Sequence, residues 1–120
     1  MPRDLSFPRT RRLTRTAEFE HVRQNGKAWR GNLITLAVAT AADADENTRI
    51  GIIASRKVGG AVVRNRSRRR LREIFRRHQQ SIGTGLWLVA ILTARAGRAS
   101  YQQLEDEWLL LARRASILAP

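Results

Sequence analysis

The sequence predicts a single domain of the α+β class, and three observations point to it. Its 120 residues are enough for one hydrophobic core but not for two. Hydrophobic residues make up 42% of the chain, which is typical of a globular protein rather than a disordered one. Segments with helical periodicity alternate with segments rich in branched residues, in the order helix, two strands, helix, strand, helix.

The first half of the chain contains a short helix and two strands. Thr14 or Thr16 can cap the helix, and the Asn-Gly pair at 25–26 is a stop signal. Phe19 and Val22 share one helix face. The elements that follow are a short strand near 28–30, a strand over 32–40, a polar turn over 41–47 and a strand over 48–55. We expect the last two strands to pair as a hairpin.

The second half of the chain contains another strand and a closing helix. Residues 86–94, LWLVAILTA, form a continuous apolar run of the length of a buried strand. Spacings of three and four then predict a helix with the stripe Tyr101, Leu104, Trp108, Leu111, Ala112 and Ala115. The acids at 105–107 are expected near its first turns, where the helix dipole favours them. We expect Trp87 and Trp108 to lie in the core.

The chain is strongly basic. Lys and Arg number 23 against 10 Asp and Glu, which gives a formal net charge of +13. All the basic residues except Lys27 and Lys57 are arginine, whose planar guanidinium grips phosphate with two hydrogen bonds and stacks on bases. Such an excess of charge repels itself until a polyanion neutralises it. The composition therefore predicts a nucleic-acid partner.

The composition also excludes several classes of protein. The chain has no cysteine, so it has no disulfide framework, thiolate nucleophile or cysteine metal site. No apolar run approaches the roughly 20 residues that span a membrane, and residues 1–15 lack the apolar centre of a signal peptide. We therefore expect a cytoplasmic protein. Residues 1–12 are basic and aperiodic and predict a flexible arm, which leaves 13–120 as a single RNA-binding domain.

Residues 56–77, RKVGGAVVRNRSRRRLREIFRR, concentrate positive charge on one predicted helix, with Glu73 as their only acid. The side expected to face the sheet carries Val63, Ser67, Leu71, Ile74 and Phe75. The opposite side carries Asn65, Arg68, Arg69, Arg72 and Arg76, with Arg66 and Arg77 on its flank. Like charges four residues apart destabilise an isolated helix by about 0.2–0.5 kcal/mol per pair. Solvated helix faces normally mix both signs, so this face predicts an anionic ligand.

The segment 55–73, SRKVGGAVVRNRSRRRLRE, resembles the signature of the bacterial ribonuclease P protein subunit. The residues characteristic of that family are Arg56, Lys57, Gly59, Ala61, Val62, Arg64, Asn65, Arg66, Arg68, Arg69, Arg72 and Glu73. Residues 12–31 resemble the family's first helix and the turn after it, and 49–57, RIGIIASRK, resembles the strand that enters the signature. The resemblance covers roughly residues 11–95 and is most specific in the middle.

This resemblance implies a small two-layer α/β sandwich with a mixed sheet, of the kind found in a ribosomal protein domain. It also implies a left-handed βαβ crossover, although such connections are usually right-handed. The implied partners are the catalytic RNA of ribonuclease P and precursor tRNA, with no membrane and no small-molecule substrate. The implied reaction is hydrolytic removal of the 5′ leader of precursor tRNA, with Mg²⁺ and the catalytic groups held by the RNA subunit and the substrate rather than by this chain.

The resemblance also implies two RNA-binding sites. The signature helix and its preceding loop would bind the RNA subunit through Arg56, Lys57, Gly59, Arg64, Asn65, Arg66, Arg68, Arg69 and Arg72. A cleft between the first helix and the sheet would bind the single-stranded leader through Arg12, Arg15, Phe19, Trp29 and Arg30. The Phe19 ring would stack on a base, with ordinary core packing as its alternative role.

The chain departs from the family pattern at four positions, Arg23, Ala37, Ser67 and Arg70. Arg23 and Ala37 stand where aromatic residues are common, which favours phosphate contact over base stacking. Ser67 and Arg70 replace apolar residues, so we expect looser packing of the signature helix on the sheet.

We find no catalytic or metal site in the chain itself. Its clustered acids are Asp43, Asp45 and Glu46 in a polar loop and Glu105, Asp106 and Glu107 at consecutive helix positions. Neither group can by itself surround a metal ion. His21 and His78 are the only histidines, and a surface position or an RNA contact is a simpler role for them than acid–base catalysis.

Two alternatives stay open from the sequence. A structural RNA-binding protein of the ribosomal type would share the positive charge and take no part in cleavage. A basic amphipathic helix on a membrane surface is disfavoured, because a wide apolar face does not separate the arginines.

Overall fold

The computed structural model describes residues 11–43 and 47–118. Its helices are α1 (Thr16–Asn25), α2 (Ala61–His78) and α3 (Tyr101–Arg114). Its strands are β1 (Lys27–Arg30), β2 (Ile34–Thr40), β3 (Arg49–Ile53) and β4 (Leu86–Leu92), and short 3-10 turns are η2 (Arg56–Val58), η3 (Gln79–Ser81) and η4 (Ala94–Arg98). The predicted order of helices and strands is confirmed, including the short strand after α1. No helix in the described ranges is long and apolar enough to cross a membrane.

The four strands form one mixed sheet in the order β1-β2-β4-β3. β2 pairs antiparallel with β1 and β4, and β3 pairs parallel with β4. The predicted hairpin between β2 and β3 is therefore wrong, because β4 lies between these strands. β4 takes the central place because most of its side chains, on both faces of the sheet, are buried. The polar turn before β3 thus leads to the edge of the sheet rather than back along β2.

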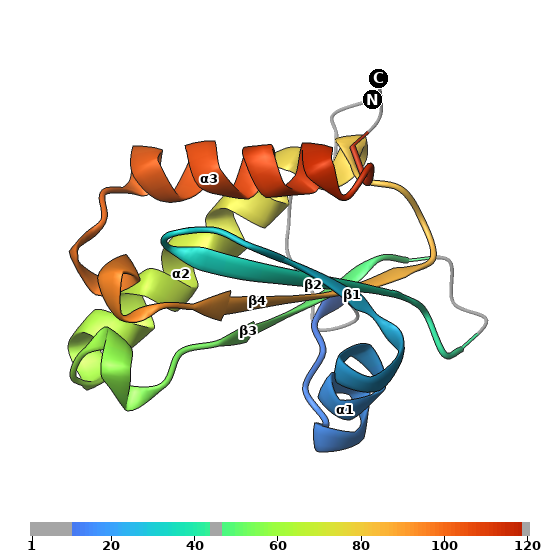
Figure 1. Ribbon diagram of the computed structural model, residues 1–120, viewed down its shortest axis with the longest axis horizontal. Coiled ribbons are helices and arrows are strands. Elements are labelled where there is room, and N and C mark those ends of the chain that lie inside the picture. The colour runs from blue at the N-terminus through green and yellow to red at the C-terminus, as the bar shows by residue number, and fades with distance from the viewer. Residues whose placement is uncertain (1–10, 44–46, 119–120) are drawn as a thin grey trace.

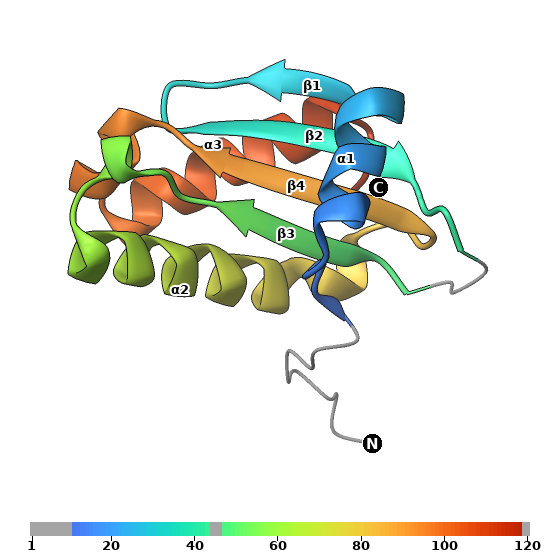
Figure 2. The same ribbon diagram turned by 90° about the horizontal axis from the view of Figure 1, so that it is seen from below.

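α2 joins the parallel strands β3 and β4 by a left-handed crossover. In Figure 2 the arrows of β3 and β4 both point to the left, with β4 above β3. α1 lies in front of the sheet in this view, whereas the main core places α2 with α3 on the opposite face. The chain therefore turns from β3 through α2 to β4 in the sense opposite to the usual one. The predicted crossover is confirmed.

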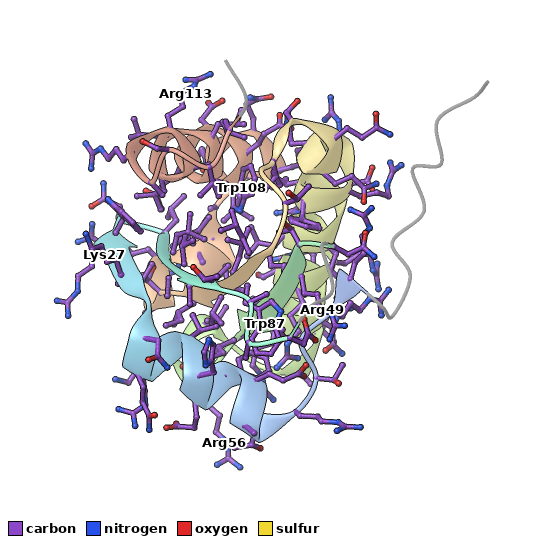
Figure 3. The ribbon with its side chains drawn as sticks, turned by 90° about the vertical axis from the view of Figure 1, so that its right-hand side faces the viewer. Lys27, Arg49, Arg56, Trp87, Trp108 and Arg113 are labelled. Carbon is purple, nitrogen blue, oxygen red and sulfur yellow. The ribbon has the colours of Figure 1, made fainter. Side chains whose placement is uncertain are left out.

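Helices cover both faces of the sheet (Figure 1). α2 and α3 pack over the main core, and α1 crosses the other face over a smaller cluster that includes Leu13 and Val22. Figure 3 shows Trp108 between α3 and the sheet and Trp87 on the side of α1. The prediction that both tryptophans are core residues is confirmed, since they are 0% and 5% exposed.

The apolar stripe of α2 anchors this helix to the sheet. Leu71, Ile74 and Phe75 are each fully buried, as the helical periodicity predicts. Ser67 is also buried, and its hydroxyl donates a hydrogen bond of 2.9 Å to the carbonyl oxygen of Val63 one turn earlier. This bond satisfies a polar group that would otherwise be costly inside the core.

α3 begins with a capping box, in which Ser100 and Gln103 bond to each other's backbone N–H groups. The predicted stripe is buried at Leu104, Trp108 and Leu111. The acids at 105–107 lie near the first turns of α3, as predicted, although the first turn itself contains no acid. They lie beyond that turn, where Glu107 faces the sheet and Asp106 is exposed.

Glu107 connects α3 to the turn between β1 and β2. Its carboxylate accepts hydrogen bonds from the backbone N–H groups of Asn32, Leu33 and Ile34 at 2.9, 2.7 and 2.6 Å. A turn that enters a sheet leaves such N–H groups without strand partners, and a charged acceptor satisfies them strongly. Glu107 is therefore a structural acid.

Replacing Glu107 should destabilise the fold. In Glu107→Ala, partly buried N–H groups lose their acceptor, so we expect the free energy of unfolding to fall by about 2 to 4 kcal/mol. Urea denaturation measures this change, with Asp106→Ala as the control because Asp106 is exposed on the same helix. Equal and small effects of the two substitutions would show that the three hydrogen bonds contribute little.

Candidate nucleic-acid interface

The surface of α2 that points away from the sheet carries the densest positive charge. Asn65 and Arg69, one helical turn apart, are both exposed and form the outer row of this surface. Arg76 lies on the same row and bonds to Glu73, with 2.9 Å between Arg76 Nε and a Glu73 carboxylate oxygen. This hydrogen bond is the main reason why the pKa of Glu73 is lowered. The one acid of the helix is thus already paired, and Arg69 has no such partner among the described residues.

A second row of arginines faces the edge of β3. Arg68 donates to the carbonyl oxygen of Ala54 at 3.3 Å and to the Asn65 side chain at 3.2 Å. The pKa of Arg72, one turn later, is lowered by burial and by the charges of Arg12 and Arg68. Like charges are therefore held together here at an energetic cost, which an anion would remove.

Arg12 lies beside this row and also lines a hollow on one flank of α1 together with Arg15. It forms a parallel bridge with Ile50 of β3, and the N–H of Leu13 donates to the Ile50 carbonyl oxygen at 2.9 Å. This pairing brings the Arg12 charge beside those of Arg68 and Arg72. Arg12, predicted as part of the flexible arm, is thus attached to the sheet, and Arg11 contacts the Asn47 side chain at 3.4 Å, whereas 1–10 lie outside the described residues.

A third row of α2 faces the loop before α3. Arg66 donates to the carbonyl oxygen of Gly97 at 3.1 Å, and Arg70 donates to that of Ala99 at 2.9 Å. Arg70 thus tethers α2 to the loop, and the expected looser packing of the helix on the sheet stays a prediction. Arg66, predicted to bind RNA, has a structural contact as well.

The loop before α2 presents two further cations. Arg56 and Lys57 are exposed in η2, and Figure 3 shows Arg56 pointing away from the molecule. Gly59 follows with φ of +150°, a conformation open almost exclusively to glycine. A Cβ there would also lie 2.9 Å from Val63. Gly59 therefore allows the chain to turn tightly from η2 into α2, which sets the position of the two cations.

A mainly apolar hollow of about 240 Å³ lies between α1 and the sheet. The apolar residues that line it are Phe19, Val22, Ala28, Ala37, Ile53, Val89 and Ile91. Phe19 is half-buried, and its ring packs so closely on Gly51 that a Cβ there would lie 2.5 Å away. One part of the ring therefore contacts the sheet, while the residue also borders the hollow. Ile53 and Ile91 are 39% and 38% exposed, which is unusual for large apolar side chains.

The residues predicted to bind the leader are only partly brought together. Arg30 pairs with Thr35, a residue of the hollow, so both side chains lie on the face that α1 crosses. Arg12 and Arg15 together line a separate hollow on the other flank of α1, beside Glu18 and Arg49. Trp29 packs against the main core on the opposite face. Its predicted place in the cleft is wrong, because side chains alternate along a strand and the sequence did not give the phase of β1.

The rim of the hollow carries charged residues, of which Lys27 was not named from the sequence. Arg23 and Glu20 form an ion pair of 2.7 Å at the rim, and Lys27 of β1 also lines the hollow. An exposed cation at the mouth of an apolar hollow suits a ligand that combines a base with a phosphate. Lys27 has the same phase along β1 as Trp29, so strand alternation does not predict its place beside the hollow.

The described acids and histidines have structural partners. The Glu18 carboxylate accepts from the N–H groups of Thr14 and Arg15 at 2.9 and 2.8 Å and so caps α1. Burial raises the pKa of Glu18, but those two hydrogen bonds and the charge of Arg49 outweigh it and lower the pKa overall. His21 contacts the Thr40 carbonyl oxygen at 3.0 Å. Within the described ranges no group of three or more His, Asp or Glu could hold a metal ion.

His78 contributes to the packing of α2 against α3. Its ring stacks on Trp108 with 6.1 Å between centroids and contacts the Glu105 carboxylate at 3.0 Å. Glu105 is 8% exposed and is also paired with Arg77 at 3.4 Å. Of the acidic loop predicted from the sequence, Asp43 pairs with Arg49 at 3.5 Å, and Asp45 and Glu46 lie outside the described residues.

A mixed four-stranded sheet, a left-handed crossover and an arginine-covered crossover helix define a small basic RNA-binding domain. The family model described as Ribonuclease P matches residues 7–116. The chain is 36% identical over 116 residues to a ribonuclease P protein component of Pseudanabaena sp., covering 93% of this chain and 97% of that one. It is 39% identical over 111 residues to one of Chloroflexus aggregans, covering 92% and 81%. The chain therefore belongs to the ribonuclease P protein family.

Solved structures agree with this assignment. The RNase P protein from Thermotoga maritima superposes with a TM-score of 0.74 at 28% identity, covering 85% of this chain and 96% of that one. The RNase P protein of Staphylococcus aureus gives a TM-score of 0.82 at 23% identity, covering 90% and 97%, and supports the fold. The chain thus acts as the protein subunit of an endoribonuclease complex in tRNA processing, with ribonuclease P RNA as its partner. The ribosomal alternative is set aside.

Proposed function

We propose that α2 and η2 bind the ribonuclease P RNA, while the hollow beneath α1 binds the single-stranded 5′ leader of precursor tRNA. The observation that carries this proposal is the placement of the two surfaces on different sides of the sheet (Figure 1). Two RNAs can then contact one small domain without competing for the same side chains. The cations of α2 suit phosphates, and the apolar hollow suits an unstacked base.

The RNA-subunit surface in this proposal combines phosphate contacts from several elements. Its members are Arg56, Lys57, Gly59, Arg64, Asn65, Arg66, Arg68, Arg69 and Arg72, together with Arg12. Arg12 is moved to this surface because its charge lies beside those of Arg68 and Arg72. The leader surface keeps Phe19 and Arg30 and adds Lys27, with Arg15 on the far flank of α1.

Catalytic groups and Mg²⁺ in this proposal belong to the RNA subunit and the substrate. The described acids support it, because Glu18 caps α1, Glu107 holds the turn before β2 and Glu105 pairs with α2. These carboxylates are occupied in separate parts of the fold and do not converge. The protein's own contribution is electrostatic, since it lowers the repulsion between two RNAs that divalent ions otherwise screen. We place this work in the cytoplasm, where the RNA partner is made.

Contacts to the leader give the holoenzyme selectivity. The leader leaves once the bond is cut, so a protein that contacts it binds the substrate without holding the mature product. The positive charge near the hollow, from Lys27 and Arg30, attracts any leader sequence, and Phe19 adds stacking that tolerates every base. The protein thereby favours precursor over product without reading a sequence.

Removing two arginines of α2 tests the RNA-subunit surface. In Arg69→Ala/Arg72→Ala, binding of the ribonuclease P RNA should weaken, and the slope of log K against log salt should become shallower by about 1 to 2. Arg69 is exposed and Arg72 is half-buried, so the substitutions leave the buried stripe of α2 unchanged. Filter binding at several salt concentrations measures the slope, and urea denaturation measures the stability.

The matched control is Arg113→Ala/Arg114→Ala, which removes the same charge from the exposed end of α3 (Figure 3). Its salt slope should stay close to that of the unmodified protein. Equal losses in both double variants would mean that net charge alone binds the RNA, and the assignment of α2 would be wrong.

Substituting Phe19 tests the leader surface. Phe19→Leu keeps an apolar contact with Gly51 but removes the aromatic face, so holoenzyme affinity for precursor tRNA should fall roughly 5- to 150-fold. Affinity for mature tRNA, which has no leader, should stay nearly unchanged. The control is Phe75→Leu, the same substitution in the main core, which should lower stability without changing the ratio of the two affinities. Equal losses for precursor and mature tRNA in Phe19→Leu would return Phe19 to a purely structural role.

A further inference from the structure

The two parallel strands of the sheet end in matching turns. β3 runs through Ser55 into η2, and β4 runs through Thr93 into η4. The backbone angles agree closely, with φ of −79° and ψ of 173° at Ser55 and φ of −82° and ψ of 172° at Thr93. In each turn the residue three places later donates its N–H back to this residue, at 3.0 Å from Val58 and 3.1 Å from Ala96.

The side chains of the two turns match as well. Val58 and Ala96 occupy the third place after Ser55 and Thr93 and are 5% and 1% exposed. Lys57 and Arg95 directly precede Val58 and Ala96, and both are exposed. Equivalent cations therefore leave the ends of two neighbouring strands in equivalent positions.

These turns line an open hollow of about 710 Å³. Figures 1 and 2 show the green turn after β3 beside the orange turn after β4, at the end of the sheet to which both arrows point. The cations that line the hollow are Lys57, Arg95 and Arg98, and no acid is among its described lining residues. The carboxyl ends of parallel strands are a common place for ligands in α/β sheets.

Close contacts hold the two turns together. A Cβ on Gly97 would lie 2.2 Å from the carbonyl oxygen of Val58, so only glycine permits the observed approach. Arg66 of α2 donates to the Gly97 carbonyl oxygen at 3.1 Å. The backbone that carries these cations is therefore held in place by close contacts.

The charge of the hollow is not balanced within the described part of the chain. Lys57, Arg95 and Arg98 form no ion pair or side-chain hydrogen bond with another described residue. Three like charges around one hollow repel each other and attract an anion. The arginines offer planar donors that fit the oxygens of a phosphate.

We infer that the hollow between η2 and η4 binds backbone phosphate of the ribonuclease P RNA through Arg95 and Arg98, together with Lys57. The RNA subunit is favoured over the leader because the hollow adjoins the α2 surface through Val63 and Arg66, whereas the hollow lined by Phe19 lies beneath α1. This inference rests on the proposed function of α2. It extends the RNA-subunit surface to residues that lie outside the signature segment 55–73.

The variant Arg95→Ala/Arg98→Ala tests the inference in the full-length protein. Affinity for the ribonuclease P RNA should fall roughly 5- to 30-fold, and the salt slope should become shallower by about 1 to 2. Arg95→Lys/Arg98→Lys, which keeps the charge, should retain most of the affinity. Arg113→Ala/Arg114→Ala is the control with equal charge removed, and the urea midpoint of each variant verifies folding.

A second measurement does not depend on affinity. The chain has no cysteine, so a reagent that generates hydroxyl radicals can be attached at a single position. When it is attached to Ala94→Cys, at the exposed rim of the hollow, the reagent should cleave the bound RNA subunit at a defined place. On Arg114→Cys, at the end of α3, it should not cleave at that place.

The outcomes separate this inference from the proposed function. Weakened RNA binding in Arg69→Ala/Arg72→Ala together with unchanged binding in Arg95→Ala/Arg98→Ala would overturn the inference alone. Unchanged binding in both variants would overturn both. A loss of discrimination between precursor and mature tRNA in Arg95→Ala/Arg98→Ala, with the RNA subunit bound normally, would assign the hollow to the leader and also overturn the inference.

Discussion

The fold depends on one apolar stripe that holds a highly charged helix against the sheet. Leu71, Ile74 and Phe75 are fully buried, and burial of such side chains stabilises the fold by about 1.5–3 kcal/mol each. Against this contribution stand the repulsions among the arginines, each of about 0.2–0.5 kcal/mol for neighbouring turns of a helix. Burial therefore prevails, and α2 stays folded while it keeps unneutralised charge ready for RNA. The pKa of Arg72 is lowered mainly by burial, and the charges of Arg12 and Arg68 add to the effect.

The position of this helix also determines how the domain divides its work. The crossover places α2 beside the edge strand β3, where Arg12 joins its charge, and leaves the other face of the sheet to α1. That face carries an apolar hollow rather than a dense cationic surface. One surface is therefore suited to structured RNA with many phosphates and the other to a flexible strand with exposed bases. The same sheet separates and fixes both surfaces.

Much of this organisation could be predicted from the sequence, because it is local. Helical periodicity gave the buried stripe that ends at Phe75, and the signature segment gave the family. Long-range placement could not be predicted. The grouping of Arg12 with α2 depends on a bridge to β3, and the orientation of Trp29 depends on the phase of a short edge strand. Glu107 and Arg95 gain their roles from partners that are distant in sequence, which composition and spacing do not reveal.

The central claim is that this protein supplies charge and leader contacts while RNA performs the cleavage. Single-turnover cleavage of a leader-bearing precursor tRNA tests it most directly, with protein alone, RNA alone and both together across a range of Mg²⁺ concentrations. We predict no cleavage by the protein alone, and cleavage by the mixture at lower Mg²⁺ than the RNA alone requires. Mg²⁺-dependent cleavage at the mature 5′ end by rigorously RNA-free protein, abolished by a substitution such as Glu18→Ala, would contradict the claim and make this chain the nuclease.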